Sequence, residues 1–145
     1  MISLQPITWA DYRNVLNLKV VESQKGFVAP NSVSLAEAYL DMVDADGDPF
    51  VTLAICNADE AVGFIMSARD DDCEYENDNE TCCFINRFMI YEKLQGRGFG
   101  KAAMEQLMQY LKSTWPRGEA AHLYLGCKET GQVKYGNEII ARLKL

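Results

Sequence analysis

A glycine-rich run between a predicted strand and a predicted helix is the part of this sequence best suited to bind an anion. Glycine has no Cβ, so the backbone N–H groups of such a run can surround an anion closely. A helix N-terminus adds unpaired N–H donors and the positive end of the helix dipole, and two basic side chains add charge. These features predict a diphosphate site in the segment Gln95-Gly96-Arg97-Gly98-Phe99-Gly100-Lys101.

Two familiar nucleotide-binding loops fit this run poorly. A P-loop places Ser or Thr directly after its Gly-Lys pair to bind magnesium, whereas Ala102 follows Gly100-Lys101 here. A dinucleotide-binding fingerprint belongs near the start of a βαβ unit and needs an acidic residue about 20 positions later. In this chain the glycines come late, and Glu119 falls in a predicted turn.

A third pattern fits closely. Gln95-x-x-Gly98-x-Gly100, placed after an apolar strand and at the start of a helix, resembles the acetyl-CoA pyrophosphate loop of the GNAT superfamily of N-acetyltransferases. Two helices, a β-hairpin and an acidic segment precede it in the order of that family. The resemblance runs from Met1 to about Leu125 and resumes at the C-terminus. It implies an α+β fold, with a central mixed and mostly antiparallel sheet flanked by helices, as a single domain over residues 1–145.

Hydrophobic periodicity and turn residues predict the individual elements. We expect strands at residues 1–7, 50–56, 61–68, 84–91, 121–125 and 138–145. We expect helices from Thr8 to about Glu22, from Ser34, and over residues 100–113, the first two opened by capping boxes. Turns or loops are expected at residues 25–31, 46–49, 57–60, 70–80 and 115–118. The helix residues expected to face the core are Val15, Leu16, Val20, Leu35, Tyr39, Met42, Ala103, Leu107, Tyr110 and Leu111.

The resemblance also implies how acetyl-CoA is held. Amides of the glycine-rich run bind the pyrophosphate, and backbone groups at the end of the preceding strand bind the pantetheine arm. One of these amides polarises the thioester oxygen while the deprotonated acceptor amine attacks the carbonyl and thiolate leaves. The cofactor-binding residues implied in this way are Phe88, Met89, Ile90, Gln95, Gly96, Arg97, Gly98, Phe99, Gly100 and Lys101.

Three segments resemble the diamine and polyamine branch of this family: GFVAPN at residues 26–31, SLAEA at 34–38 and NRFMI at 86–90. The acceptor implied is a small cationic amine. A general base is needed because an alkylamine is protonated near neutral pH. Glu22, or Asn86 through an ordered water, is a candidate on position, although a single carboxylate on a helix is usually only solvated.

The sequence departs from the family after Leu125. Family members have a helix there that commonly carries a Tyr, which protonates the departing thiolate. Here residues 121–125 run directly into Gly126-Cys-Lys-Glu-Thr-Gly131, so the helix is missing and the C-terminal half is truncated. Because one glycine cannot supply the crossover between parallel strands, we expect residues 121–129 to form one long strand that pairs antiparallel with residues 138–145. Tyr124 is the remaining candidate acid, though a strand Tyr is more often a packed aromatic.

Composition limits the classes of partner that we expect this protein to bind. The net charge of -7 disfavours nucleic acid and agrees with a cationic substrate. The five cysteines form no CxxC pair and His122 is the only histidine, so no metal site is expected. No apolar run approaches the ~20 residues that span a bilayer, and no secretory signal is recognisable, so we expect a cytoplasmic protein. A second subunit could cover the gap left by the missing helix, which suggests a homodimer.

Two functions remain open at this stage. The first is an acetyl-CoA-dependent N-acetyltransferase acting on a diamine or polyamine, slowed by loss of the acid. The second is a catalytically weak or silent acyl-CoA-binding module that acts as a sensor or scaffold. The glycine-rich run supports both equally, and the missing helix favours the second. A transferase for protein amines is disfavoured because nothing in the sequence marks a peptide groove.

Overall fold

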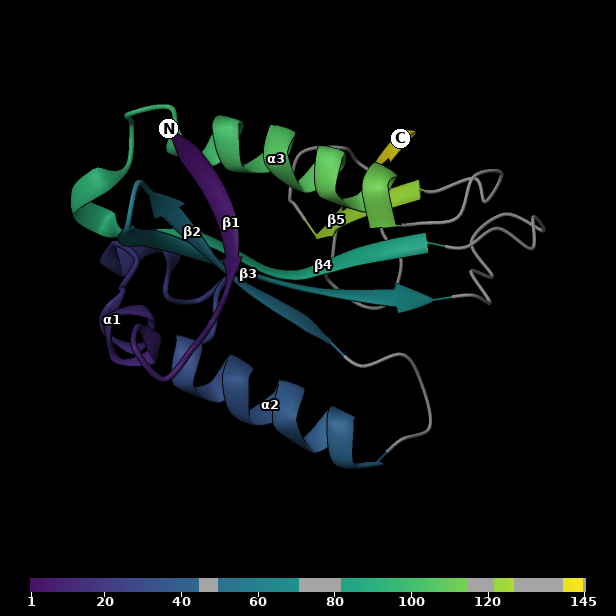
Figure 1. Cartoon of the computed structure of the whole chain (residues 1–145), viewed down its shortest axis with the longest axis horizontal. Coiled ribbons are helices and arrows are strands. Elements are labelled where there is room, and N and C mark those ends of the chain that lie inside the picture. The colour runs from purple at the N-terminus through teal and green to yellow at the C-terminus, as the bar shows by residue number, and fades with distance from the viewer. Residues whose placement is uncertain (45–49, 71–81, 115–121, 127–139, 145) are drawn as a thin grey trace.

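Among the residues that the structure describes, six strands form one sheet, and helices cover both of its faces (Figure 1). The computed structural model describes residues 1–44, 50–70, 82–114, 122–126 and 140–144. In chain order the elements are β1 (Ile2–Pro6), α1 (Tyr12–Asn17), the 3-10 helix η1 (Glu22–Gln24), α2 (Asn31–Asp44), β2 (Val51–Asn57), β3 (Glu60–Asp70), β4 (Cys82–Ile90), the 3-10 helix η2 (Glu92–Leu94), α3 (Phe99–Thr114), β5 (His122–Gly126) and β6 (Ile140–Lys144).

The sheet has the strand order β1-β2-β3-β4-β5-β6, and every pair is antiparallel except β4–β5. α3 lies in the crossover that this parallel pair requires. β2 and β3 meet in a tight turn between Asn57 and Glu60, where Ala58 has a φ of 53°. β5 and β6 pair antiparallel, with His122 opposite Lys144, as predicted. The expected mixed, mostly antiparallel sheet flanked by helices is confirmed.

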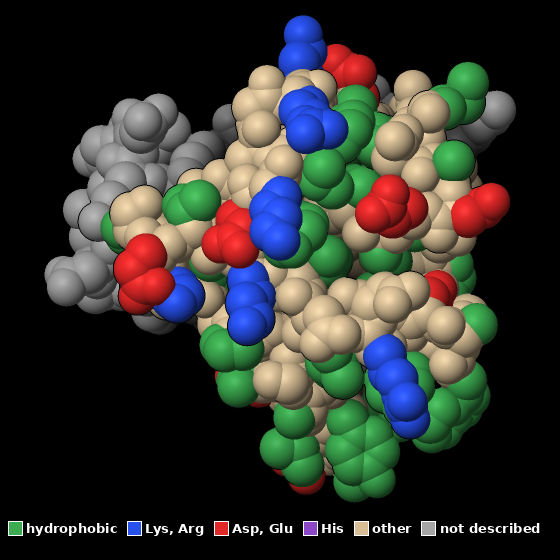
Figure 2. Space-filling view, turned by 90° about the vertical axis from the view of Figure 1, so that its left-hand side faces the viewer, with side chains coloured by type: hydrophobic (Ala, Val, Ile, Leu, Met, Phe, Trp, Pro, Cys, Tyr) green, Lys and Arg blue, Asp and Glu red, His purple; other side chains and the backbone are tan. Residues whose placement is uncertain are grey.

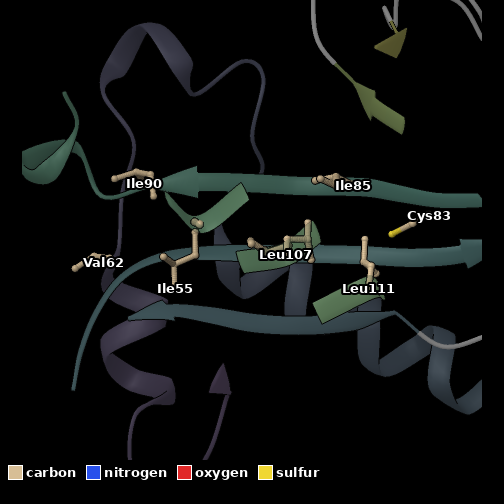
Figure 3. Packing of buried hydrophobic residues seen from close by; sticks show 9 residues of the cluster. Ile55, Val62, Cys83, Ile85, Ile90, Leu107 and Leu111 are labelled. Carbon is tan, nitrogen blue, oxygen red and sulfur yellow. The ribbon is translucent and has the colours of Figure 1, made fainter. Parts of the chain in front are cut away.

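α3 covers one face of the sheet through a single apolar stripe. Ala103, Leu107 and Leu111 follow one another at four-residue spacing and are buried, so they lie on the same side of the helix. They pack on sheet residues that include Ile55 and Ile85 (Figure 3). Tyr110, which the sequence pattern assigned to this stripe, is instead exposed.

α1 and the N-terminal part of α2 cover the opposite face. Val15 is fully buried there, and Leu35 packs against the same cluster. On β3, Phe64 and Met66 face these helices while Ile65 faces α3, because side chains alternate across a strand. β3 is therefore buried on both faces, which explains its nearly continuous apolar sequence.

The first helix is shorter than the sequence predicts. Only half of the expected capping box forms: the Asp11 carboxylate accepts the Thr8 N–H at 2.6 Å, but the helix begins at Tyr12 instead of near Thr8, and its N-cap residue Asp11 makes no side-chain cap bond. α1 also ends at Asn17 instead of near Glu22, because Leu18 takes an extended conformation with φ of -68° and ψ of 133°. The extended stretch that follows lets the Lys19 carbonyl accept the Glu92 N–H at 2.8 Å, a contact with the end of β4 that local sequence does not reveal.

The second helix begins three residues earlier than predicted. α2 starts at Asn31, and Ser34 is buried in its first turn with its N–H donating to the Pro30 carbonyl. The capping box expected at Ser34 is therefore wrong. Tyr39 and Met42 were expected to face the core, yet their exposed fractions are 61% and 59%. The later turns of α2 have fewer contacts with the sheet than the sequence pattern suggested.

Several predicted features lie outside the described residues. These are the turn at 46–49, nearly all of the acidic segment at 70–80, the break at 115–118, and the continuation of β5 beyond Gly126. The missing helix after Leu125 belongs to the same group and stays a prediction.

Of the cysteines whose side chains the structure describes, two are free and buried in the core: Cys56 on the face of the sheet covered by α1, and Cys83 on the face covered by α3. Burial raises the pKa of the Cys56 thiol. Burial also raises the pKa of the Cys83 thiol to about 11, against the opposing effect of its hydrogen bond with Ser67. Because the thiolate is the reactive form, both groups are held in the inert thiol form near neutral pH.

Cys83 makes the stability of the fold sensitive to high pH. The unfolded chain releases this proton near the usual pKa of 9.0, whereas the folded chain keeps it to about 11. The folded state therefore binds more protons in this window, and stability is lost as pH rises through it. We expect the free energy of unfolding of the wild type to fall relative to Cys83→Ala by about 2 kcal/mol across the window. Urea unfolding of both proteins measures this; a difference independent of pH would contradict the assignment.

Candidate functional site

The glycine-rich run forms the junction between β4 and α3, as predicted. β4 ends at Ile90, η2 makes one tight turn, and α3 begins at Phe99. Gly96 and Gly98 have φ values of 76° and 81°, a left-handed conformation that side chains with a Cβ rarely adopt. These two glycines turn the chain back toward the sheet.

The first turn of α3 presents unused backbone donors. The Ala102 N–H donates to the Gly98 carbonyl at 3.1 Å and is the first amide of the helix with such a bond. The amides before it have no partner within a helix, and they concentrate the positive end of the helix dipole. A Cβ on Gly100 would lie 3.7 Å from both the Phe88 and the Ile90 side chains, so this turn rests against the end of β4.

Gln95 fixes the start of the loop. Its Nε2 donates to the Ile90 carbonyl at 2.9 Å and to Gln24 Oε1 at 2.8 Å. The side chain therefore joins the end of β4, the loop and η1. Sequence analysis assigned Gln95 to cofactor binding, and its side chain is here committed to bonds within the protein.

β4 leaves its parallel partner halfway along its length. Residues Cys82 to Ile85 pair with β5, whereas pairing with β3 continues to Ile90. The two strands part at Asn86. A bulge interrupts the register between β3 and β4 at the same place, so Asn86 has no opposite residue on β3. From Asn86 to Ile90 the far edge of β4 has no strand partner among the described residues.

The ladder identifies which backbone groups face this free edge. The Tyr91 N–H donates to the Val62 carbonyl at 2.8 Å, so Tyr91 bonds toward β3. Antiparallel strands alternate bonded and non-bonded residues, so Met89 also bonds toward β3, while Phe88 and Ile90 direct their N–H and C=O groups outward. The sequence-based hypothesis named all three residues; the strand geometry leaves the backbone of Phe88 and Ile90 at the edge.

A cavity of about 390 Å³ connects the edge of β4 with the glycine turn. Its walls come from β4, the loop, the start of α3 and the segment around η1, which sequence analysis had not linked to the cofactor. The lining residues from that segment are Val20, Gln24, Phe27 and Val28. Figure 2, turned toward the side that bears the loop, shows hydrophobic side chains at the centre of the face with Lys, Arg, Asp and Glu side chains around them.

The polar surroundings suit an anion at the rim and an uncharged chain inside. Arg97 and Lys101 are exposed beside the loop, and no titratable side chain lines the described part of the cavity. Groups of three or more His, Cys, Asp or Glu suited to a metal are not found in the described ranges. Within those ranges, no helix has the length and apolar character needed to cross a bilayer.

The candidate catalytic residues come from three different elements, η1, β4 and β5. Glu22 forms an exposed ion pair with Lys25 and does not line the cavity. That pair raises the pKa of Lys25, through the hydrogen bond and then the charge of Glu22. Asn86 is exposed at the point where β4 and β5 part. Tyr124 lies on β5 opposite Phe84, and its side chain is outside the described ones. All three roles stay predictions.

The sheet, the glycine turn and the open strand edge agree with what sequence comparison finds. The model of the acetyltransferase (GNAT) family matches residues 7–134. The chain therefore belongs to the acetyltransferase (GNAT) family.

Individual relatives are distant. The chain is 26% identical over 111 residues to a spermine/spermidine N(1)-acetyltransferase of Bacillus subtilis strain 168, covering 76% of this chain and 68% of that protein. A GNAT family acetyltransferase of Staphylococcus aureus superposes with a TM-score of 0.60 at 15% identity, covering 98% of both chains. The PaiA N-acetyltransferase of Thermoplasma acidophilum, solved with coenzyme A, gives 0.57 at 13% identity and covers 100% and 99%.

Gly63 keeps β3 close to the β4 residues that form the cavity. A Cβ at this position would overlap the Met89 carbonyl oxygen and lie 2.9 Å from Ile55 Cδ1. We expect Gly63→Ala to lower the free energy of unfolding by about 1–3 kcal/mol, as overpacking does. Gly26→Ala is the matched control, since nothing lies within 4 Å of its Cβ position. Urea unfolding compares the two, and equal stabilities would contradict the close approach.

Proposed function

We propose that this chain transfers the acetyl group of acetyl-CoA to a primary amine of a small cationic substrate. The observation that carries the proposal is one continuous cavity that joins the unpaired edge of β4 to the glycine turn at the start of α3. An unpaired strand edge suits the amide-containing pantetheine arm, because it offers the same bonds as a neighbouring strand. A helix start with free amides suits a diphosphate.

Each part of the site has a role in this proposal. The amides from Gly96 to Lys101 hold the diphosphate, with Arg97 and Lys101 adding charge at the rim. The backbone of Phe88 and the N–H of Ile90 hold the arm and align it along β4. Acetyl-CoA supplies a thioester, whose carbonyl the deprotonated amine attacks while the coenzyme thiol leaves. The apolar walls exclude water from the arm, which strengthens every hydrogen bond made to it.

A diamine or polyamine is the proposed acceptor class. The support is the likeness to the spermine/spermidine acetyltransferase of Bacillus subtilis and the net charge of -7, which raises the local concentration of cations. An acyl-CoA-binding module without turnover is the second candidate. It is favoured by one observation: the described part of the cavity contains no side chain that could act as a base.

Gly98→Val tests the diphosphate site. A β-branched residue is strained at a φ of 81°, and the turn would have to open. We expect CoA affinity to fall by at least about 10-fold, which corresponds to about 1.4 kcal/mol. Ala58→Val is the matched control, because it places the same side chain at a positive φ in the β2–β3 turn. Calorimetric titration with CoA measures the affinity of both variants. A folded Gly98→Val protein that binds CoA with full affinity would contradict the assignment of the diphosphate site to this loop.

Release of free thiol from acetyl-CoA separates the two candidate functions. We expect thiol release that depends on added spermidine or putrescine. A panel of aminoglycosides, tested in the same way, serves as the comparison. The rate should increase with pH as the amine loses its proton. Tight binding of acetyl-CoA without thiol release for any amine would reject the transferase and leave the silent module.

A further inference from the structure

The hydrogen bonds of two glutamines determine each other's orientation. The Ile90 carbonyl can only accept, so the atom of Gln95 that contacts it at 2.9 Å must be the amide nitrogen. The same nitrogen lies 2.8 Å from the Gln24 side chain, and its second proton requires an acceptor there. The contacting atom of Gln24 is therefore Oε1. A backbone group thus fixes both side-chain amides, which are otherwise ambiguous.

This arrangement leaves the Gln24 amino group available. With Oε1 turned to Gln95, the Nε2 of Gln24 has no hydrogen-bond partner within the described residues. Gln24 lines the cavity from η1, whereas Phe88 and Ile90 line it from β4. Its Nε2 is also accessible to solvent, since it is not among the buried side-chain atoms without a partner. The site therefore has an oriented donor on the wall contributed by η1.

We propose that Gln24 donates from Nε2 to an amide carbonyl of the pantetheine arm, and so selects an acyl-CoA over a plain nucleotide diphosphate. This inference rests on the proposed function. The arm has two amide groups, which need partners on both sides once the cavity removes them from water. The edge of β4 supplies hydrogen-bond partners on one side of the arm, and Gln24 supplies a donor from the opposite wall. Gln95, whose own orientation is fixed by the Ile90 carbonyl, fixes the orientation of this donor.

Gln24→Met tests the donor, because it removes the amide while keeping the length of the side chain and adding no charge. We expect CoA affinity to fall by about 3- to 10-fold, the value of one neutral hydrogen bond. ADP has the diphosphate but no arm, so its affinity should be unchanged. Gln95→Met removes the bond that holds the loop to Ile90 and should weaken CoA and ADP together. Ser23→Ala, an exposed change on the same 3-10 helix, is the control and should alter neither.

Competition against a fluorescent CoA analogue measures both ligands for all four proteins. A larger loss for CoA than for ADP in Gln24→Met supports the inference. Equal losses for the two ligands would overturn it, because Gln24 would then act only by holding the loop. Unchanged CoA affinity would overturn it as well. Failure of the wild type to bind CoA would instead reject the proposed function, so the two failures are distinguishable.

Discussion

The site depends on the point at which β4 stops pairing with β5. As far as Ile85 the two strands are bonded in parallel, and beyond it the part of the chain that the structure describes gives β4 only its antiparallel partner. Backbone N–H and C=O groups that are removed from water require partners, so an unpaired edge inside a cavity is costly unless something binds there. In this chain the unpaired edge leads to a helix start with free amides of its own. Both features present backbone donors to the same cavity.

In the proposed site, backbone groups do most of the recognition of the coenzyme, so their position must be held by the rest of the fold. Gly63 lets β3 approach the Met89 carbonyl, and the stripe on α3 fixes the helix against the sheet. Gln95 holds the loop to the Ile90 carbonyl. On the far side, Asn31 is buried below β4, where its Nδ2 donates to the Val15 carbonyl at 2.9 Å. These contacts connect core packing to the geometry of the cavity.

The glycine loop could be predicted from sequence because its information is local. Glycine residues at two left-handed positions, a preceding apolar strand and a following amphipathic helix all fall within one short segment. The stripe of α3 was predictable for the same reason, apart from Tyr110. Charge and composition suggested a cationic partner, and this stays a prediction.

The features that sequence missed arise from contacts between distant segments. α1 ends early because the extended stretch after it bonds to Glu92, and α2 starts early on the Pro30 carbonyl. Neither partner is visible in a local pattern. Gln24 joins the site through a bond to Gln95, 71 positions away. A glutamine in a short polar segment gives no local signal of this kind, so only the folded chain reveals it.

A crystal structure of the chain with CoA tests the central claim most directly. It should show the diphosphate oxygens within hydrogen-bond distance of the amides at the start of α3, and the arm bonded to the backbone of Phe88 and Ile90. Coenzyme bound elsewhere, or a turn at residues 95–101 left empty by saturating coenzyme, would contradict the account.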